Sequence, residues 1–124
     1  MNNITVEFSN MNHLDYDALN TLRDVMEGDF PLLIDTFILD STERLQKLHT
    51  IINSANADLI RRSAHSFKGS SSNIGAIQLA ALCASLEKKA LDGDLVNLDQ
   101  DLRAIEQEYA QVENLLRAML QVSR

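Results

Sequence analysis

Apolar residues recur every three or four positions over most of the chain, which is the spacing of one face of an α-helix. The clearest run lies near the C-terminus, where the steps between successive apolar residues alternate between four and three. Its members are Leu98, Leu102, Ile105, Tyr109, Val112, Leu116 and Met119. No segment sustains the strict alternation of apolar and polar residues that is typical of strands. The pattern therefore predicts an all-α protein.

Breaks in this pattern separate the first two predicted helices. A short helix is expected over about residues 14–26, and it ends near Glu27–Gly28. The next helix begins after Asp29, a suitable N-cap, and carries Pro31 in its first turn, where proline is tolerated. It continues for about six turns, until the polar break at 53–56.

Three further helices follow with short connections. Asn56 is suited to cap the third helix, and Gly93 suits the position just beyond the end of the fourth. The last helix starts after Asp94 or Asn97. Short connections between long amphipathic helices favour an antiparallel four-helix bundle, with the short additional helix at its N-terminus. We expect residues 1–12 to be a flexible tail and residues 13–124 to be one bundle domain.

Composition narrows the class of protein. The net charge is −7 and the isoelectric point is about 4.8, which argues against a nucleic-acid surface and against binding to anionic membranes. No apolar run approaches the roughly 18 residues of a membrane span, and the first residues lack the features of a signal peptide. The single cysteine, Cys83, is expected in the core of a reduced, cytoplasmic protein.

One stretch stands apart, because "AHSFKGSSSNIGA" (64–76) is rich in poor helix formers yet lies where the third helix should continue. If the helix runs through about residue 72, His65 faces water, opposite the core side of the helix. The residues within roughly 60° of it are Arg61, Arg62, Lys68, Gly69 and Ser72. A neutral imidazole is a good nucleophile near pH 7, and the neighbouring cations are placed to meet an anion. Gly69 leaves a dent beside the ring.

This stretch resembles the signature of the histidine-phosphotransfer (HPt) domain family, roughly H-x-x-K-G-S-S-x-x-x-G-A, and the likeness continues through Leu79–Glu87. The resemblance implies a stand-alone bacterial carrier in which His65 is phosphorylated and Lys68 contacts the phosphoryl group. It also implies that Gly69 admits a receiver domain and that Glu87, on the adjacent helix, orients the imidazole. Family members relay phosphoryl groups between receiver-domain aspartates in multistep phosphorelays.

The same resemblance implies the partners. They are the receiver domain of a hybrid sensor kinase and that of a response regulator. From the helical face of His65 we expect them to dock over Arg61, Arg62, Gly69 and Ser72, and a solvated surface pair is the alternative for Arg61 and Arg62. We expect a monomeric phosphocarrier that has no ATP-binding or hydrolytic site of its own and no cofactor. Mg²⁺ is expected only in the partner receiver domain.

Other interpretations have weaker support. A helical adaptor that binds a receiver domain or regulator without carrying phosphate remains the alternative, and the intact His65–Lys68 pair disfavours it. The stretch is a poor phosphate loop, because the Walker order is reversed and no strand precedes it. A di-iron bundle would need a Glu-x-x-His pair, which the sequence lacks. His13 and His49 have no comparable neighbours and are expected to be ordinary surface residues.

Overall fold

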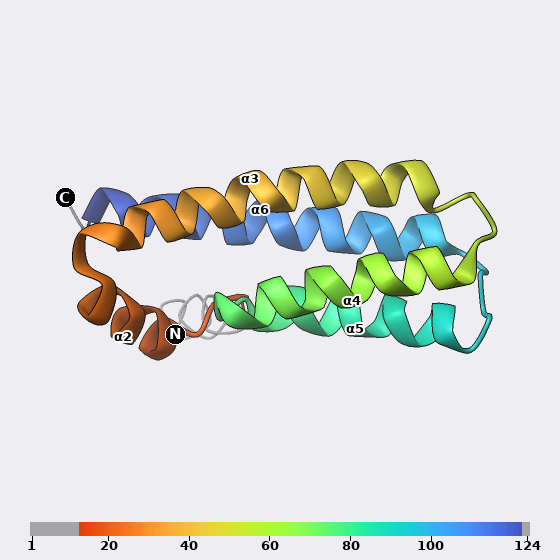
Figure 1. Cartoon of the computed structure of the whole chain (residues 1–124), viewed down its shortest axis with the longest axis horizontal. Coiled ribbons are helices and arrows are strands. Elements are labelled where there is room, and N and C mark those ends of the chain that lie inside the picture. The colour runs from red at the N-terminus through yellow and green to blue at the C-terminus, as the bar shows by residue number, and fades with distance from the viewer. Residues whose placement is uncertain (1–12, 123–124) are drawn as a thin grey trace, which may run out of the picture.

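The computed structural model describes residues 13–122, and every regular element in that range is helical. One turn of 3-10 helix, Glu27–Asp29, joins the first two of the helices labelled in Figure 1. The α-helices are α2 (Tyr16–Met26), α3 (Phe30–Ile51), α4 (Ala57–Asn73), α5 (Ile77–Leu91) and α6 (Leu98–Val122). The predicted tail, residues 1–12, lies outside the described residues.

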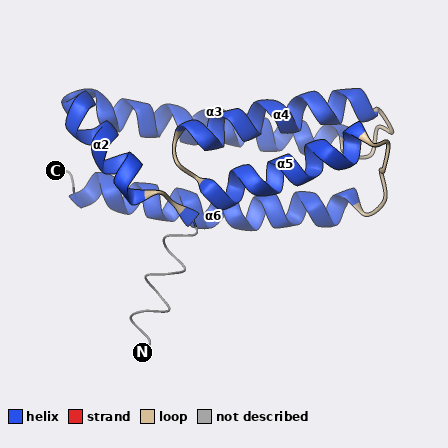
Figure 2. Ribbon diagram, turned by 90° about the horizontal axis from the view of Figure 1, so that it is seen from below, coloured by secondary structure: helices blue, strands red, loops and turns tan. Residues whose placement is uncertain are grey.

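The four long helices form an antiparallel bundle (Figure 1). Each packs against two neighbours, in the cyclic order α3, α4, α5, α6, and Figure 2 shows the short loops that join them. Helices α3 and α6 have 22 and 25 residues, whereas α4 and α5 have 17 and 15. The longer pair therefore extends past the α4–α5 hairpin at one end, and α2 lies there (Figure 1). The predicted bundle with a short additional N-terminal helix is confirmed.

The core is built from the predicted apolar stripes. All seven members of the C-terminal stripe are buried, and full burial of each aliphatic side chain contributes roughly 1.5–3 kcal/mol. Tyr109 satisfies its hydroxyl by donating to the Ile38 carbonyl oxygen at 3.2 Å. Cys83 is completely buried, as expected, and this burial raises the pKa of its thiol to about 12. The thiol is therefore an inert packing group at neutral pH.

Capping residues set the ends of α4, the second of the four long helices. The Asn56 side chain accepts a hydrogen bond from the Leu59 amide at 3.0 Å, so the predicted N-cap of α4 is confirmed. Helix α4 ends at Asn73, and Gly75 follows with φ +80°, a conformation that favours glycine. A Cβ on Gly75 would lie 3.3 Å from the Cβ of Asp15, whose amide donates to the Gly75 carbonyl at 2.8 Å. The segment before α2 thus covers the α4–α5 turn.

A second contact ties this N-terminal segment to α6. His13 Nδ1 lies 2.6 Å from Glu108 Oε2, and Glu108 is only 5% exposed. A carboxylate this deep needs a partner, because an unpaired buried charge is strongly destabilising. His13 is therefore a structural residue, rather than the ordinary surface residue predicted from the sequence.

Candidate functional site

The glycine- and serine-rich stretch continues α4 as a helix through Asn73, as predicted to within one residue. One side of this helix is buried in the core and consists of Ile60, Ala64, Phe67 and Ser71. The imidazole of His65 lies on the opposite side and is 63% exposed. The ring is therefore open to a reactant that approaches from solvent.

A carboxylate from the neighbouring helix holds this ring. Glu87 Oε2, on α5, lies 2.7 Å from His65 Nδ1, and Glu87 Oε1 lies 2.7 Å from Lys68 Nζ. The structure thus brings together all three residues of the predicted centre. The ion pair between Lys68 and Glu87 was not foreseen, although His65 and Lys68, three residues apart on α4, face α5 together.

The protonation states follow from these contacts. The hydrogen bond from Lys68, and then the one from His65, hold the pKa of Glu87 below its ordinary range despite partial desolvation. An ionised carboxylate only accepts hydrogen bonds, so the Nδ1 atom of His65 carries the proton. In the neutral ring, Nε2 is then the nitrogen with the available lone pair. Glu87 therefore selects the tautomer of His65.

The two arginines before His65 share one carboxylate of the same helix. Arg61 and Arg62 both contact Asp58, at 2.9 and 2.8 Å, and the hydrogen bond from Arg61 is the main cause of the lowered pKa of Asp58. The pair is thus partly neutralised by a carboxylate that sequence reasoning did not include. Surface pairs of this kind contribute little to stability, so an incoming anion can compete with Asp58 for either guanidinium group.

The two small residues of the predicted docking face are open. A Cβ built on Gly69 meets no atom within 4 Å, so the space beside the His65 ring is empty. Ser72 is exposed, and no hydrogen bond of its side chain occurs among the described residues. Between residues 13 and 122, no three acidic, histidine or cysteine side chains gather closely enough to hold a metal ion. In the same range no helix is long and apolar enough to cross a membrane.

Comparison with known proteins identifies this arrangement. The family model of the Hpt domain matches residues 32–121, which include α4, α5 and the whole His65 centre. The chain belongs to the Hpt domain family. Comparison with curated protein sequences finds no match.

Solved structures agree with this assignment. The Hpt domain described here is similar to histidine-containing phosphotransfer protein B of Pseudomonas aeruginosa, at 44% identity and a TM-score of 0.86. That comparison covers 90% of this chain and 97% of the other. Histidine-containing phosphotransfer protein 2 of Medicago truncatula (24% identity, TM-score 0.81, covering 94% and 83% of the chains) shares its fold. So does a rice protein described as a putative histidine-containing phosphotransfer protein (20% identity, TM-score 0.80, covering 97% and 92%).

Membership of the family establishes the general function. Hpt domains take part in histidine phosphotransfer within phosphorelays and interact with receiver domains. The chain is accordingly a phosphocarrier, and the helical bundle is the scaffold on which the phosphotransfer centre is presented.

Proposed function

We propose that His65 is the residue that carries the phosphoryl group, and that Nε2 is the atom that receives it. The observation that supports this most directly is the 2.7 Å contact between His65 Nδ1 and Glu87 in a ring that is otherwise open to solvent. Glu87 fixes the ring and leaves Nε2 as the nucleophile. His49 is equally exposed, but it lacks a lysine and a glycine on the following turn.

Transfer of the phosphoryl group to the neutral His65 ring then needs no proton from another group. The Nε2 lone pair of His65 attacks phosphorus of an aspartyl phosphate on a receiver domain, a P–N bond forms, and the acyl P–O bond breaks. The electron pair of that bond leaves with the receiver's aspartate as a carboxylate. The phosphorylated ring keeps its Nδ1 proton and carries a positive charge, which the adjacent Glu87 carboxylate stabilises. Transfer to a second receiver is the reverse of this step.

Lys68 has two positions in this scheme. In the unphosphorylated protein its ammonium group is held by Glu87 at 2.7 Å. The phosphoryl group adds negative charge one helical turn away, and Lys68 contacts it, which lowers the cost of placing that charge on the surface. Mg²⁺, which neutralises charge during transfer, belongs to the receiver domain in this proposal.

The partners are the receiver domains of a hybrid sensor kinase and of a response regulator. Each docks over the outward face of α4, where Gly69 lets the partner's backbone approach. Ser72 has a small side chain that leaves room for the partner on the same face. Arg61 and Arg62 meet acidic groups around the receiver's aspartate. The protein acts as a cytoplasmic monomer and relies on its partners for ATP-dependent chemistry.

The test is incubation of the wild type and of histidine variants with a ³²P-labelled receiver domain. Label should appear on the wild type, resist alkali and be lost in acid, as expected of a phosphoramidate. It should be absent from His65→Gln. A matched control is His49→Gln, which removes a second exposed histidine that also contacts a glutamate, Glu106 at 3.1 Å. Label that persists in His65→Gln but disappears in His49→Gln would refute the assignment, and no label on the wild type would favour an adaptor.

A further inference from the structure

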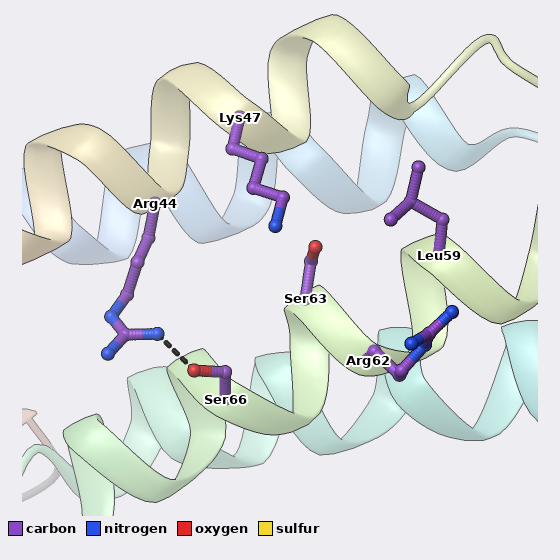
Figure 3. Close-up of a pocket in the computed structure, with 6 residues that line it drawn as sticks. All are labelled: Arg44, Lys47, Leu59, Arg62, Ser63 and Ser66. Carbon is purple, nitrogen blue, oxygen red and sulfur yellow. Dashed lines mark hydrogen bonds between the residues drawn. The ribbon is translucent and has the colours of Figure 1, made fainter.

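An open cleft lies between α3 and α4, on the flank of α4 that faces away from α5. It has a volume of about 250 Å³ and is lined by six residues, all drawn in Figure 3. Arg44 and Lys47 come from α3, and the α4 residues are Leu59, Arg62, Ser63 and Ser66. Three of the six are cations and none is acidic, in a chain whose net charge is −7. We call these six residues the cation cleft.

Several donors in the cation cleft lack an acceptor. The Lys47 side chain extends toward α4 (Figure 3), and its ammonium forms no hydrogen bond or ion pair with any residue of the described range. Ser63 Oγ points into the cleft and is buried without a partner in the same range. Arg44 donates through Nη1 to Ser66 Oγ, and no carboxylate of residues 13–122 pairs with it. A buried polar group without a partner costs about 1–3 kcal/mol, so an incoming acceptor would relieve this cost.

The balance of charge favours an acidic occupant. Arg62 is offset by Asp58 at 2.8 Å, whereas Arg44 and Lys47 have no such partner. Asp40 and Glu43 line a neighbouring hollow together with Arg44 and Lys47, and Asp40 also lines the groove that continues along α4. Among the six residues of the cation cleft, no carboxylate offsets Arg44 or Lys47. A carboxylate there finds cations on both helices and a free hydroxyl between them.

The position of the cleft relates it to the phosphotransfer centre. Arg62 and Ser66 lie three residues before and one residue after His65 on α4. A second groove of about 440 Å³ shares Arg44 and Ser66 with the cation cleft and continues along α4 to Gly69. A protein seated over His65 and Gly69 therefore also covers this flank of α4.

We propose that the cation cleft binds an aspartate or glutamate side chain of the docked receiver domain, and so selects which receivers this Hpt domain accepts. The proposal rests on the proposed phosphotransfer at His65. It adds residues of α3, which the sequence motif does not contain, as determinants of specificity. Charged contacts at an interface act mainly on encounter and partner choice, so the cleft contributes to receiver affinity and leaves the chemistry of the ring unchanged.

The experiment compares Lys47→Glu with Arg103→Glu, two reversals of an exposed cation that change the net charge equally; Arg103 lies on α6, outside the cleft. Two donors are used: a phosphorylated receiver domain at several concentrations, and the small donor phosphoramidate. With the receiver, Lys47→Glu should raise KM by about tenfold with little change in kcat, and with phosphoramidate it should match the wild type within about twofold. Arg103→Glu should match the wild type in both assays.

Two results would overturn the proposal. One is an unchanged KM for the receiver in Lys47→Glu, and the other is an equal loss of labelling by phosphoramidate, which would mean that the residue acts on His65. Failure of the wild type to be labelled by either donor would instead refute the proposed function. Restoration of KM in Lys47→Glu by an acidic-to-lysine change in the receiver would identify the bound carboxylate.

Discussion

Because the space beside Gly69 is empty, substitutions at this position should change the stability of the bundle and the rate of phosphotransfer in opposite directions. A Cβ there meets nothing within 4 Å, and the backbone is ordinary helix without a positive φ. Replacing glycine with alanine inside a helix is worth about 1 kcal/mol, and no clash offsets it here. For a chain of 124 residues this gain corresponds to a rise in Tm of about 3–5 °C. Gly69→Gln should gain about half as much, since glutamine is a slightly weaker helix former.

Transfer should change in the opposite direction. Position 69 lies one turn beyond His65 on the same face of α4, so a glutamine side chain occupies the space through which a receiver reaches the ring. We expect Gly69→Gln to slow transfer from a phosphorylated receiver by tenfold or more, and Gly69→Ala to slow it less. Labelling by phosphoramidate should be retained in both, because a small donor does not need the space.

The assays are thermal unfolding followed by circular dichroism, and single-turnover transfer with each donor. If Gly69→Gln accepts phosphate from the receiver at the wild-type rate, the space at position 69 is not what lets the receiver reach His65. A lowered Tm in Gly69→Ala would show that the glycine is required by the backbone, contrary to the open space seen around it.

Four further predictions concern the charged pairs. Lys68→Ala should slow phosphotransfer from the receiver by about tenfold, because one charge-assisted contact with the phosphoryl group is lost. A change in Tm of more than about 2 °C would point to a structural role instead. Glu87→Gln should keep most of the transfer rate, because its amide oxygen still accepts a hydrogen bond from His65 Nδ1. Glu87→Ala should lower the transfer rate about 10–100-fold, and equal losses in the two variants would contradict the orienting role. Because the pKa of Glu87 is lowered on folding, the ionised carboxylate stabilises the fold at neutral pH, and this contribution is lost as the pH falls through the folded pKa. The urea midpoints of the wild type and of Glu87→Gln should therefore become equal in acid. His13→Ala should destabilise the fold by about 1–3 kcal/mol by leaving Glu108 buried without a partner, and His13→Gln should recover part of this; an unchanged urea midpoint would show that the pair contributes nothing.

Much of the fold could be predicted from the sequence, because one stripe with a regular spacing is enough to define each long helix. The C-terminal stripe is buried in full, and the alternatives for the start of the last helix resolve to Leu98, just after Asn97. The turn at Glu27–Gly28 became one turn of 3-10 helix rather than a simple break. Such boundaries depend on one or two hydrogen bonds that the periodicity of apolar residues does not encode.

The candidate site could be predicted where it depends on one helix or on a family motif. The outward face of His65 follows from helical periodicity alone. The contact with Glu87 was implied by the family resemblance, and its second contact, with Lys68, depends on how α5 sits against α4. The pairing of His13 with Glu108 spans 95 residues and has no local signal. The cation cleft likewise needs the relative placement of two helices, which the motif does not specify.

The burial of Cys83 has a practical consequence for all of these variants. The chain has a single thiol, which is wholly enclosed between the helices, and this burial raises its pKa to about 12. A thiol reagent at neutral pH will therefore modify only molecules whose bundle has opened, and the labelling rate will report how often that happens. In every variant described above, the rate at which Cys83 is labelled, measured by mass spectrometry, therefore reports how often the core opens, and no cysteine has to be introduced.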